Sequence, residues 1–232
     1  MQLLQIDVTG GLPAEDAVEV TESTTSIIDL MMSGGIGGQM IMVLLILLSI
    51  LAVYLFVNRL SAIRRAGKVD DKFMRDIKDY VANGNLQSAT NLCERSETPV
   101  AHMIGKGISR IGKPLQDISA SIENQGKLEI QRLERNLPLL ATIAGGAPML
   151  GFLGTVIGMI LSFKEMANAG GAVQVDMLAN GIYTAMTTTV AGLIVGILAY
   201  FGYNYLVMKV SSVIHHMETS ATEFLDLLHE PV

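Results

Sequence analysis

Four threonines are the side chains best suited to ion chemistry in the long uncharged stretches of this sequence. Thr155 lies in the segment GFLGTVIG, and a later segment holds Thr184, Thr188 and Thr189. A hydroxyl group both donates and accepts hydrogen bonds, so several hydroxyls on apolar helices could line a narrow polar path. A single threonine in a membrane helix usually bonds a carbonyl of its own helix instead. The residues alone leave both interpretations open.

No Asp, Glu, His, Lys or Arg lies within the three uncharged spans, which are residues 40–57, 137–163 and 177–208. Membrane proteins that relay protons or gate charge by themselves normally carry at least one such residue there. An ion that crosses through these spans must therefore use a titratable group from another protein, or none.

Small residues recur every three or four positions in the second and third spans, which gives each helix one face with little side-chain volume. Such faces let helix backbones approach closely, and van der Waals contact then drives association in lipid. Two of these helices in one chain predict a tightly packed bundle or ring. The packing residues that we expect are Gly151, Gly154 and Gly158 in the second span and Gly181, Ala185, Gly192 and Gly196 in the third.

The other chemistry-bearing residues give little support for an enzyme, a metal site or a bound cofactor. His215 and His216 are adjacent on an expected helix and so project about 100° apart, and His102 and His229 each stand alone in polar segments. The glycines of the second span follow no strand, which excludes a phosphate-binding loop. We therefore expect no catalytic residue, no metal and no cofactor.

The composition favours a membrane protein over a soluble one. Of the 232 residues, 50% are hydrophobic and 16% are charged, whereas soluble domains are about 25% charged. The basic residues are concentrated in residues 59–135, where acids are interleaved with them. Nucleic-acid binding is therefore not expected, and the single Cys93 excludes an internal disulfide.

Each uncharged span is long enough to cross a bilayer, because about 20 apolar residues of helix cover a hydrocarbon core of about 30 Å. Buried helices of a soluble protein would show polar faces, and these runs show none. The predicted segments are a leader with a short amphipathic interfacial helix at 1–39, transmembrane helices at 40–57, 137–163 and 177–208, a helical segment at 58–136, a short loop at 164–176 and a C-terminal helix at 209–232.

The distribution of Lys and Arg predicts how the chain crosses the membrane, because cytoplasmic flanks are enriched in these residues. Residues 1–39 contain no Lys or Arg, whereas residues 59–135, between the first two spans, contain 14 of the 16. We expect the N-terminus and the 164–176 loop in the periplasm, and the 58–136 segment and the C-terminal helix in the cytoplasm.

The predicted fold class is an all-α integral membrane protein with three transmembrane helices. Apolar residues follow a helical period in residues 71–95, and Pro99 and Pro114 each mark the start of a further helix. The helix after Pro114 shows no stop before the second span, which predicts one continuous helix of about 45 residues. The third span likewise continues into the tail. The second and third transmembrane helices are thus expected to extend into long cytoplasmic helices.

The two spans with small faces resemble those of the MotA/TolQ/ExbB proton-channel family. Within that family they are most similar to ExbB and next most similar to TolQ. The resemblance lies in GAPMLGFLGTVIGMILSF and GIYTAMTTTVAGLIVGILAYFGYNYL, joined by a short loop, and in the connector GNLQSATNLCERSETPVAHMIGKGI. MotA is less similar, because it has four crossings and a much larger cytoplasmic part.

The resemblance implies a subunit of a proton-motive-force-driven motor channel in the bacterial inner membrane. Such subunits assemble as a homopentamer whose pore holds transmembrane helices of an ExbD-like partner. The partner's aspartate carries the proton, which agrees with the missing carboxylate noted above. The ExbB type works with a TonB-like protein that energises outer-membrane uptake, and membrane lipid surrounds the ring.

The family's motifs assign roles to individual threonines. Thr155 in GTVIG and Thr189 in MTTTVAG match threonines that would lie near the partner's aspartate, and Thr188 and Thr184 are the other pore-lining candidates. Thr184 departs from the pattern, because many ExbB and TolQ members have a glutamate there, and the role of that glutamate does not transfer. A TolQ-like role in envelope maintenance and a non-conducting membrane scaffold stay open, as do H⁺ and Na⁺.

Overall fold

Every element of the fold is an α-helix in the part of the chain that the structure, a computed structural model, describes: residues 36–67, 71–168 and 175–229. The helices are α2 Ile36–Ala66, α3 Asp71–Ala82, α4 Leu86–Arg95, α5 Pro99–Ile108, α6 Leu115–Glu134, α7 Leu137–Asn168 and α8 Val175–His229. Three stretches are long and apolar enough to cross a membrane, namely Gly37–Ala66, Leu115–Asn168 and Gly181–His229. The predicted all-α class with three transmembrane helices is confirmed.

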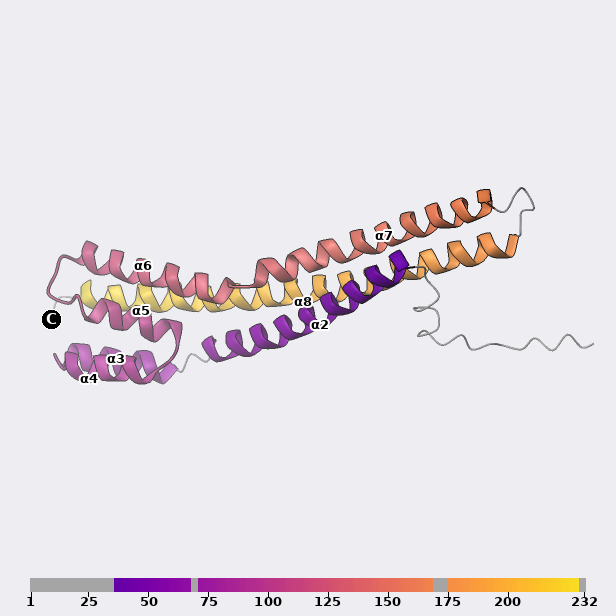
Figure 1. The fold of residues 1–232 in the computed structure, drawn as a ribbon. Coiled ribbons are helices and arrows are strands. Elements are labelled where there is room, and N and C mark those ends of the chain that lie inside the picture. The colour runs from indigo at the N-terminus through magenta and orange to yellow at the C-terminus, as the bar shows by residue number, and fades with distance from the viewer. Residues whose placement is uncertain (1–35, 68–70, 169–174, 230–232) are drawn as a thin grey trace, which may run out of the picture.

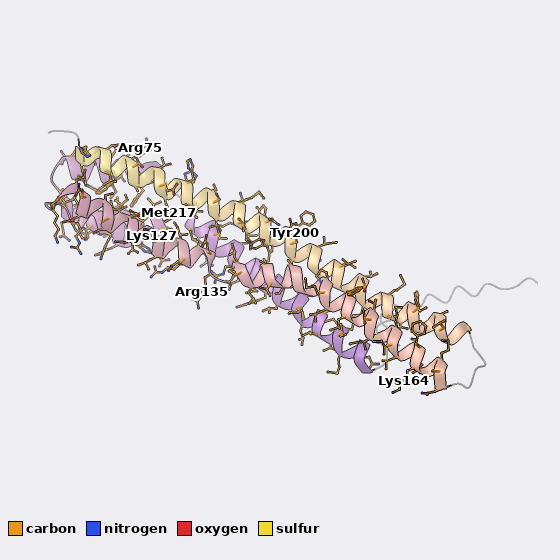
Figure 2. The ribbon with its side chains drawn as sticks, turned by 90° about the horizontal axis from the view of Figure 1, so that it is seen from above. Arg75, Lys127, Arg135, Lys164, Tyr200 and Met217 are labelled. Carbon is orange, nitrogen blue, oxygen red and sulfur yellow. The ribbon has the colours of Figure 1, made fainter. Side chains whose placement is uncertain are left out.

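The helices form an elongated molecule with two distinct ends (Figure 1). α7 lies along the N-terminal half of α8, α6 lies along its C-terminal half, and α2 packs on both α7 and α8. We call residues 71–134 and 209–229 the polar end, and residues 36–66, 137–168 and 175–208 the membrane part. Arg75 and Lys127 lie at the polar end, whereas Lys164 lies at the opposite tip of the molecule (Figure 2).

α8 is one unbroken helix that belongs to both ends. Its 55 residues correspond to a length of about 80 Å at the helical rise of 1.5 Å per residue. The sequence of α8 contains no proline, which is the residue that would most strongly interrupt it. The third transmembrane helix therefore continues into the polar end, as the sequence predicts.

The predicted continuous helix into the second span is wrong, because α6 ends at Glu134 and α7 begins at Leu137. Arg135 is non-helical, with φ −52° and ψ 133°, and Asn136 has a φ of 66°. Pro138 explains the interruption: inside a continuous helix its ring would clash with the carbonyl of Glu134, whereas the first turn of a new helix accepts proline. α6 and α7 are thus two helices with a joint between them.

The left-handed conformation of Asn136 gives a test of this joint. Asn136→Ala should lower the free energy of unfolding by about 1 kcal/mol, because the β-carbon of alanine is disfavoured at positive φ. Asn136→Gly should be neutral or stabilising, since glycine adopts this conformation freely. Thermal unfolding of the detergent-purified protein, followed by circular dichroism, measures both. Equal losses in the two variants would contradict the assigned conformation.

Capping side chains explain where the short helices of the polar end begin. Asn85 precedes α4 and its Oδ1 accepts a hydrogen bond from the Ser88 N–H at 3.2 Å. Thr98 precedes α5 and its Oγ1 accepts from the Ala101 N–H at 3.3 Å, with Pro99 as the first helical residue. Both are the side-chain types that satisfy free N–H groups at helix starts, so α4 and α5 have locally encoded starts.

The core of the polar end forms where α5 passes between α6 and α8. A β-carbon at Gly107 on α5 would lie 2.7 Å from Ile122 Cδ1 on α6 and 2.9 Å from Phe224 Cε1 on α8. Ile122 and Phe224 are 2% and 0% exposed, so neither side chain has room to move aside. The absence of a side chain at position 107 is therefore what lets three helices meet here.

Cys93 lies in the same core and should be chemically inert. Burial, with a smaller contribution from the Glu94 charge, raises the pKa of the Cys93 thiol from 9.0 to about 12. Only the thiolate is nucleophilic, and each pKa unit removes about tenfold of it at a fixed pH below 9. Iodoacetamide at pH 8 should therefore alkylate Cys93 at least about a hundredfold more slowly in the folded protein than in denaturant.

Mass spectrometry over time gives the two alkylation rates, and equal rates would contradict the buried position. The sign of the pH dependence follows from the same shift. Because the folded-state pKa is raised, burial of the neutral thiol favours folding at and below neutral pH. That contribution decreases as the pH rises above about 9.

The structure gives helix ends for most of the predicted segment boundaries. α2 is longer than the predicted 40–57 span, and α7 continues beyond residue 163 to Asn168. The predicted interfacial helix in the 1–39 leader lies outside the described residues, as do residues 169–174 of the predicted 164–176 loop. The rest of that predicted loop is helical, since α7 ends at Asn168 and α8 begins at Val175.

Candidate functional site

The small faces of α7 and α8 meet each other along the membrane part. A β-carbon at Gly158 would lie 2.7 Å from Ala185 Cβ, and one at Gly192 would lie 2.9 Å from Gly151 Cα. Nearer the polar end, Gly196 faces Pro148, and nearer the tip, Gly181 faces Ser162. Residue numbers rise on one helix as they fall on the other, so α7 and α8 run antiparallel with their backbones in close approach.

All seven packing residues expected from the sequence lie at this α7–α8 contact. Gly154, the remaining one, faces Thr188, whose Oγ1 and Cβ would collide with any added β-carbon. Ala185 is 4% exposed. In lipid, where the solvent is as apolar as the side chains, contacts of this kind are the main attraction between helices.

The contact predicts opposite effects for two glycines of the same helix bundle. At Gly192 a β-carbon would lie 2.6 Å from the Ala147 carbonyl oxygen, whereas at Gly145 nothing lies within 4 Å. Alanine is the better helix former at both positions by up to about 1 kcal/mol. Gly192→Ala should nevertheless destabilise the protein by about 1–3 kcal/mol through overpacking, while Gly145→Ala should be neutral or stabilising.

The measurement is thermal unfolding of the two purified variants in the same detergent. Gly192→Ala as stable as Gly145→Ala would show that the helices do not approach this closely.

The hydroxyls of Thr188 and Thr189 cross from α8 to α7. Both donate to the carbonyl oxygen of Gly151, at 3.2 Å from Thr188 Oγ1 and 3.1 Å from Thr189 Oγ1. Thr188 Oγ1 also lies 2.8 Å from the carbonyl oxygen of Ala185, and Thr188 is only 4% exposed. Thr188 therefore lies inside the helix contact, while Thr189 is half-buried at its edge.

Thr155 is half-buried on α7, one helical turn after Gly151. Its Oγ1 donates to the Phe152 carbonyl of its own helix at 2.6 Å. Because Thr189 bonds the Gly151 carbonyl, the hydroxyls of Thr155 and Thr189 lie at nearly the same level of the bundle. Thr188 and Thr189 thus both bond Gly151, and Thr155 lies on the next turn of the same helix α7.

Thr184 lies one turn before Thr188 on α8 and is half-buried. Its carbonyl oxygen accepts a hydrogen bond from Thr187 Oγ1 at 2.7 Å. Since facing residues run in opposite directions on the two helices, Thr184 is displaced toward the tip of the molecule. It is therefore about one turn away from the level of Thr155 and Thr189.

The hydrogen bonds define what these hydroxyls offer to a third group. Thr155 and Thr189 each direct their proton to a backbone carbonyl. A hydroxyl oxygen keeps lone pairs that accept hydrogen bonds when its own proton is used elsewhere. In this arrangement both side chains are acceptors, suited to a protonated acid, an ammonium group or water.

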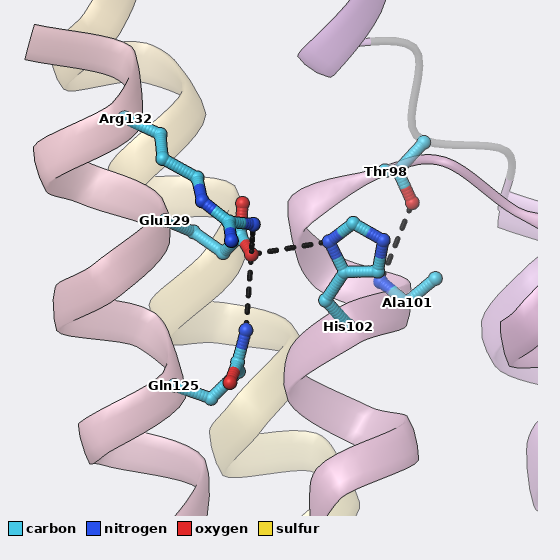
Figure 3. A network of polar contacts seen from close by, with 6 residues as sticks. All are labelled: Thr98, Ala101, His102, Gln125, Glu129 and Arg132. Atoms are coloured by element: carbon cyan, nitrogen blue, oxygen red, sulfur yellow. Dashed lines mark hydrogen bonds and ion pairs between the residues drawn. The ribbon is translucent and has the colours of Figure 1, made fainter. Parts of the chain in front are cut away.

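A second polar cluster at the polar end was not anticipated from the sequence (Figure 3). Glu129 on α6 is 6% exposed in its side chain. Its Oε1 accepts from Arg132 at 2.7 Å, Gln125 Nε2 at 3.0 Å and His102 Nδ1 at 3.1 Å. The expectation that His102 stands alone is wrong. A buried carboxylate requires such partners, and His102 is the one that connects α5 to α6.

Arg59 on α2 was used in the sequence only as an orientation signal, but it reaches the α6–α7 joint. A guanidinium nitrogen of Arg59 lies 3.5 Å from the Arg132 carbonyl oxygen, at the C-terminal end of α6, where a positive charge is favourable. Its Nε is enclosed and has no hydrogen-bond partner among the described residues. A buried, unpaired donor of this kind is uncommon in proteins.

The described residues also bear on metal binding. Among them, no group of three His, Cys, Asp or Glu side chains is placed to hold a metal ion. His215 and His216 have ring centroids 6.4 Å apart with planes inclined by 52°.

An all-α chain with three membrane-crossing helices, two of them joined by small faces and threonine hydroxyls, is the architecture of a multi-pass membrane subunit. The MotA/TolQ/ExbB proton channel family matches residues 95–219, which is more than half of the chain. This protein therefore belongs to that family.

Individual relatives agree with this family. A protein named TolQ from Haemophilus influenzae is 28% identical over 219 residues, covering 87% of this chain and 93% of that protein. A putative biopolymer transport protein ExbB homologue from Methanothermobacter thermautotrophicus is 26% identical over 83% of this chain and 67% of its own length. The biopolymer transport protein ExbB of Aquifex aeolicus is 37% identical, over 40% of this chain.

Proposed function

We propose that this chain is an ExbB-like subunit of a proton-motive-force-driven channel in the bacterial inner membrane. Five copies form a ring around transmembrane helices of an ExbD-like single-span partner. A TonB-like protein receives the resulting motion and energises outer-membrane transport. The chain itself is not an enzyme. Membership of a proton channel family, and similarity to proteins named ExbB and TolQ, support this proposal.

The proposed orientation places the polar end in the cytoplasm and the N-terminus in the periplasm. The Lys- and Arg-rich segments that flank α2 and α7 support it, because such residues are enriched on the cytoplasmic side. Both α2 and α8 run toward the polar end (Figure 1), so the same orientation is consistent for all three crossings.

The observation that carries the proposal is the pair of hydroxyls at one level of a bundle that lacks charge. Thr189 on α8 bonds the Gly151 carbonyl, and Thr155 lies one turn after Gly151 on α7. The surrounding spans 137–163 and 177–208 contain no Asp, Glu, His, Lys or Arg. A proton pathway through a membrane normally uses an ionisable group, and these two spans supply hydroxyls alone. The titrating group then comes from the partner's aspartate.

The hydrogen bonds suggest how the site treats that aspartate. Because Thr155 and Thr189 donate to backbone carbonyls, their oxygens accept a hydrogen bond from a protonated carboxyl group. The site therefore favours the neutral acid, which is the form that carries a proton through an apolar ring. When the carboxylate forms, a hydroxyl has to turn away from its carbonyl to donate to it. Thr188 lies beside Thr189 inside the helix contact, and Thr184 lies one turn nearer the tip on the same helix.

A TolQ-like role is the second candidate, because the TolQ relative matches 93% of its own length. It differs from the ExbB-like role in the proteins that co-purify with the ring, and not in the threonine chemistry. A non-conducting scaffold is the third candidate. It predicts no ion flux from the reconstituted complex at any proton gradient.

Substitution of the two threonines tests the ion-pathway proposal. Thr155→Val and Thr189→Val keep the side-chain shape but remove the acceptor. Each should reduce proton-driven uptake in cells by about tenfold or more, since an unpaired buried acid costs about 1–3 kcal/mol. Thr155→Ser and Thr189→Ser keep the hydroxyl and should retain most of the activity.

Proton flux into liposomes that contain the ring and its partner gives the direct measurement. Size-exclusion chromatography of each variant shows whether the ring still assembles. Full uptake and full flux in both valine variants would contradict the role of Thr155 and Thr189 in the ion pathway. Full assembly without any flux in the unmodified complex would favour the scaffold.

A further inference from the structure

A groove in the membrane part lies between α2, α7 and α8, away from the threonines. Its volume is about 380 Å³, and its lining is almost wholly apolar, including Val53, Phe56, Leu140, Leu198 and Tyr205. Sites that bind small molecules typically have volumes of about 300–1,000 Å³. Within a bilayer, an apolar groove of this size is open to the acyl chains of lipid.

The groove has a defined polar side. α2 and α8 run in the same direction toward the polar end (Figure 1). Phe56 on α2 and Tyr205 on α8 are the last lining residues of their helices in that direction, and their ring centroids are 6.4 Å apart. On α7, Leu140 lies in the first turn after the α6–α7 joint. The groove therefore ends where the chain leaves the apolar layer.

Cations stand at this end of the groove. Lys209 Nζ lies 5.8 Å from the centroid of the Tyr205 ring, and Arg59 follows Phe56 by one helical turn. The enclosed Nε of Arg59 has no hydrogen-bond partner among the described residues. Residues 55–67 and 200–214 contain no Asp or Glu, so these two stretches bring no carboxylate to neutralise either cation.

We propose that the groove binds an acyl chain of an anionic phospholipid, whose phosphate is held by Arg59 and Lys209. A phosphate oxygen would accept from the guanidinium group of Arg59 and the ammonium group of Lys209, and phosphate is a preferred partner of guanidinium groups. The acyl chain would cover the apolar lining between α2 and α8. An anionic lipid thus accounts for the apolar groove and for the two cations at its end together.

A second copy of this chain fits the groove less well. Neighbouring subunits of a ring meet through two different faces. The membrane part of a neighbouring copy would bring an apolar face to the groove, because residues 40–57, 137–163 and 177–208 contain no Asp or Glu. Arg59 and Lys209 would then lose water without gaining an opposite charge. An anionic headgroup has the complementary charge, which is why we choose a lipid as the occupant.

Native mass spectrometry of the full-length protein tests the site. The protein is purified in detergent with either phosphatidylglycerol or phosphatidylcholine of the same acyl chains, and lipid retained per chain is counted. Phosphatidylglycerol should be retained preferentially. Arg59→Gln and Lys209→Gln should each reduce its retention by about fivefold, as expected for one cation beside an anionic lipid. Arg65→Gln, on the exposed side of α2, should change it less than twofold.

A second pair of variants tests the groove itself. Val53→Trp fills the groove, since Val53 lines it, and should abolish retention. Val57→Trp is the matched control, because Val57 is similarly exposed, at 55% against 60%, but does not line the groove. Circular dichroism confirms that each variant is folded.

Three results would overturn the proposal. One is equal retention of the two lipids by the unmodified protein. Another is phosphatidylglycerol retention that is unchanged in Arg59→Gln, Lys209→Gln and Val53→Trp. The third is a Val53→Trp variant that loses its oligomeric state but keeps its lipid, because a second copy would then occupy the groove.

Discussion

The close approach of α7 and α8 is the constraint on which the rest of the structure depends. It exists because Gly151 and Gly192 face each other with no side chain between them. Only at that separation can the hydroxyls of Thr188 and Thr189 reach a carbonyl of the opposite helix. A bilayer offers no hydrophobic drive toward helix pairing, so packing and these hydrogen bonds have to supply the attraction. α2 then packs on a pair that is already defined.

Water imposes a different balance at the polar end. There the hydrophobic effect operates, and α3–α6 bury an ordinary apolar core around α8 that includes Ile104 and Phe224. A glycine again permits a close helix contact here, since Gly107 lets α5 enter between α6 and α8. The Glu129 cluster adds polar connections at the edge of that core. One continuous helix thus takes part in two kinds of packing, each suited to its solvent.

Much of this organisation was predictable from the sequence because it depends on local patterns. The length of each uncharged span predicted the three crossings, and the three- or four-residue spacing of small residues predicted the packing faces. Both patterns are properties of a single helix. The joint at Asn136 was missed, although Pro138 signalled it, because apolar periodicity continues across it. The His102–Glu129 contact joins residues 27 positions apart and depends on how α5 folds back on α6. In the sequence Thr188 cannot be distinguished from Thr189. Only the packing of α7 on α8 shows that Thr188 is buried while Thr189 is half-buried.

The contrast between an unbroken α8 and a jointed α6–α7 has a mechanical consequence. An unbroken helix of about 80 Å connects the membrane part to the residues around Phe224, so a rotation of α8 within the bilayer displaces those residues at its far end. The path through α6 and α7 is interrupted instead, because Arg135 is non-helical and Asn136 is left-handed. Each chain therefore combines one continuous helix, α8, with one jointed pair, α6 and α7. A change of angle at the joint leaves α8 unbroken.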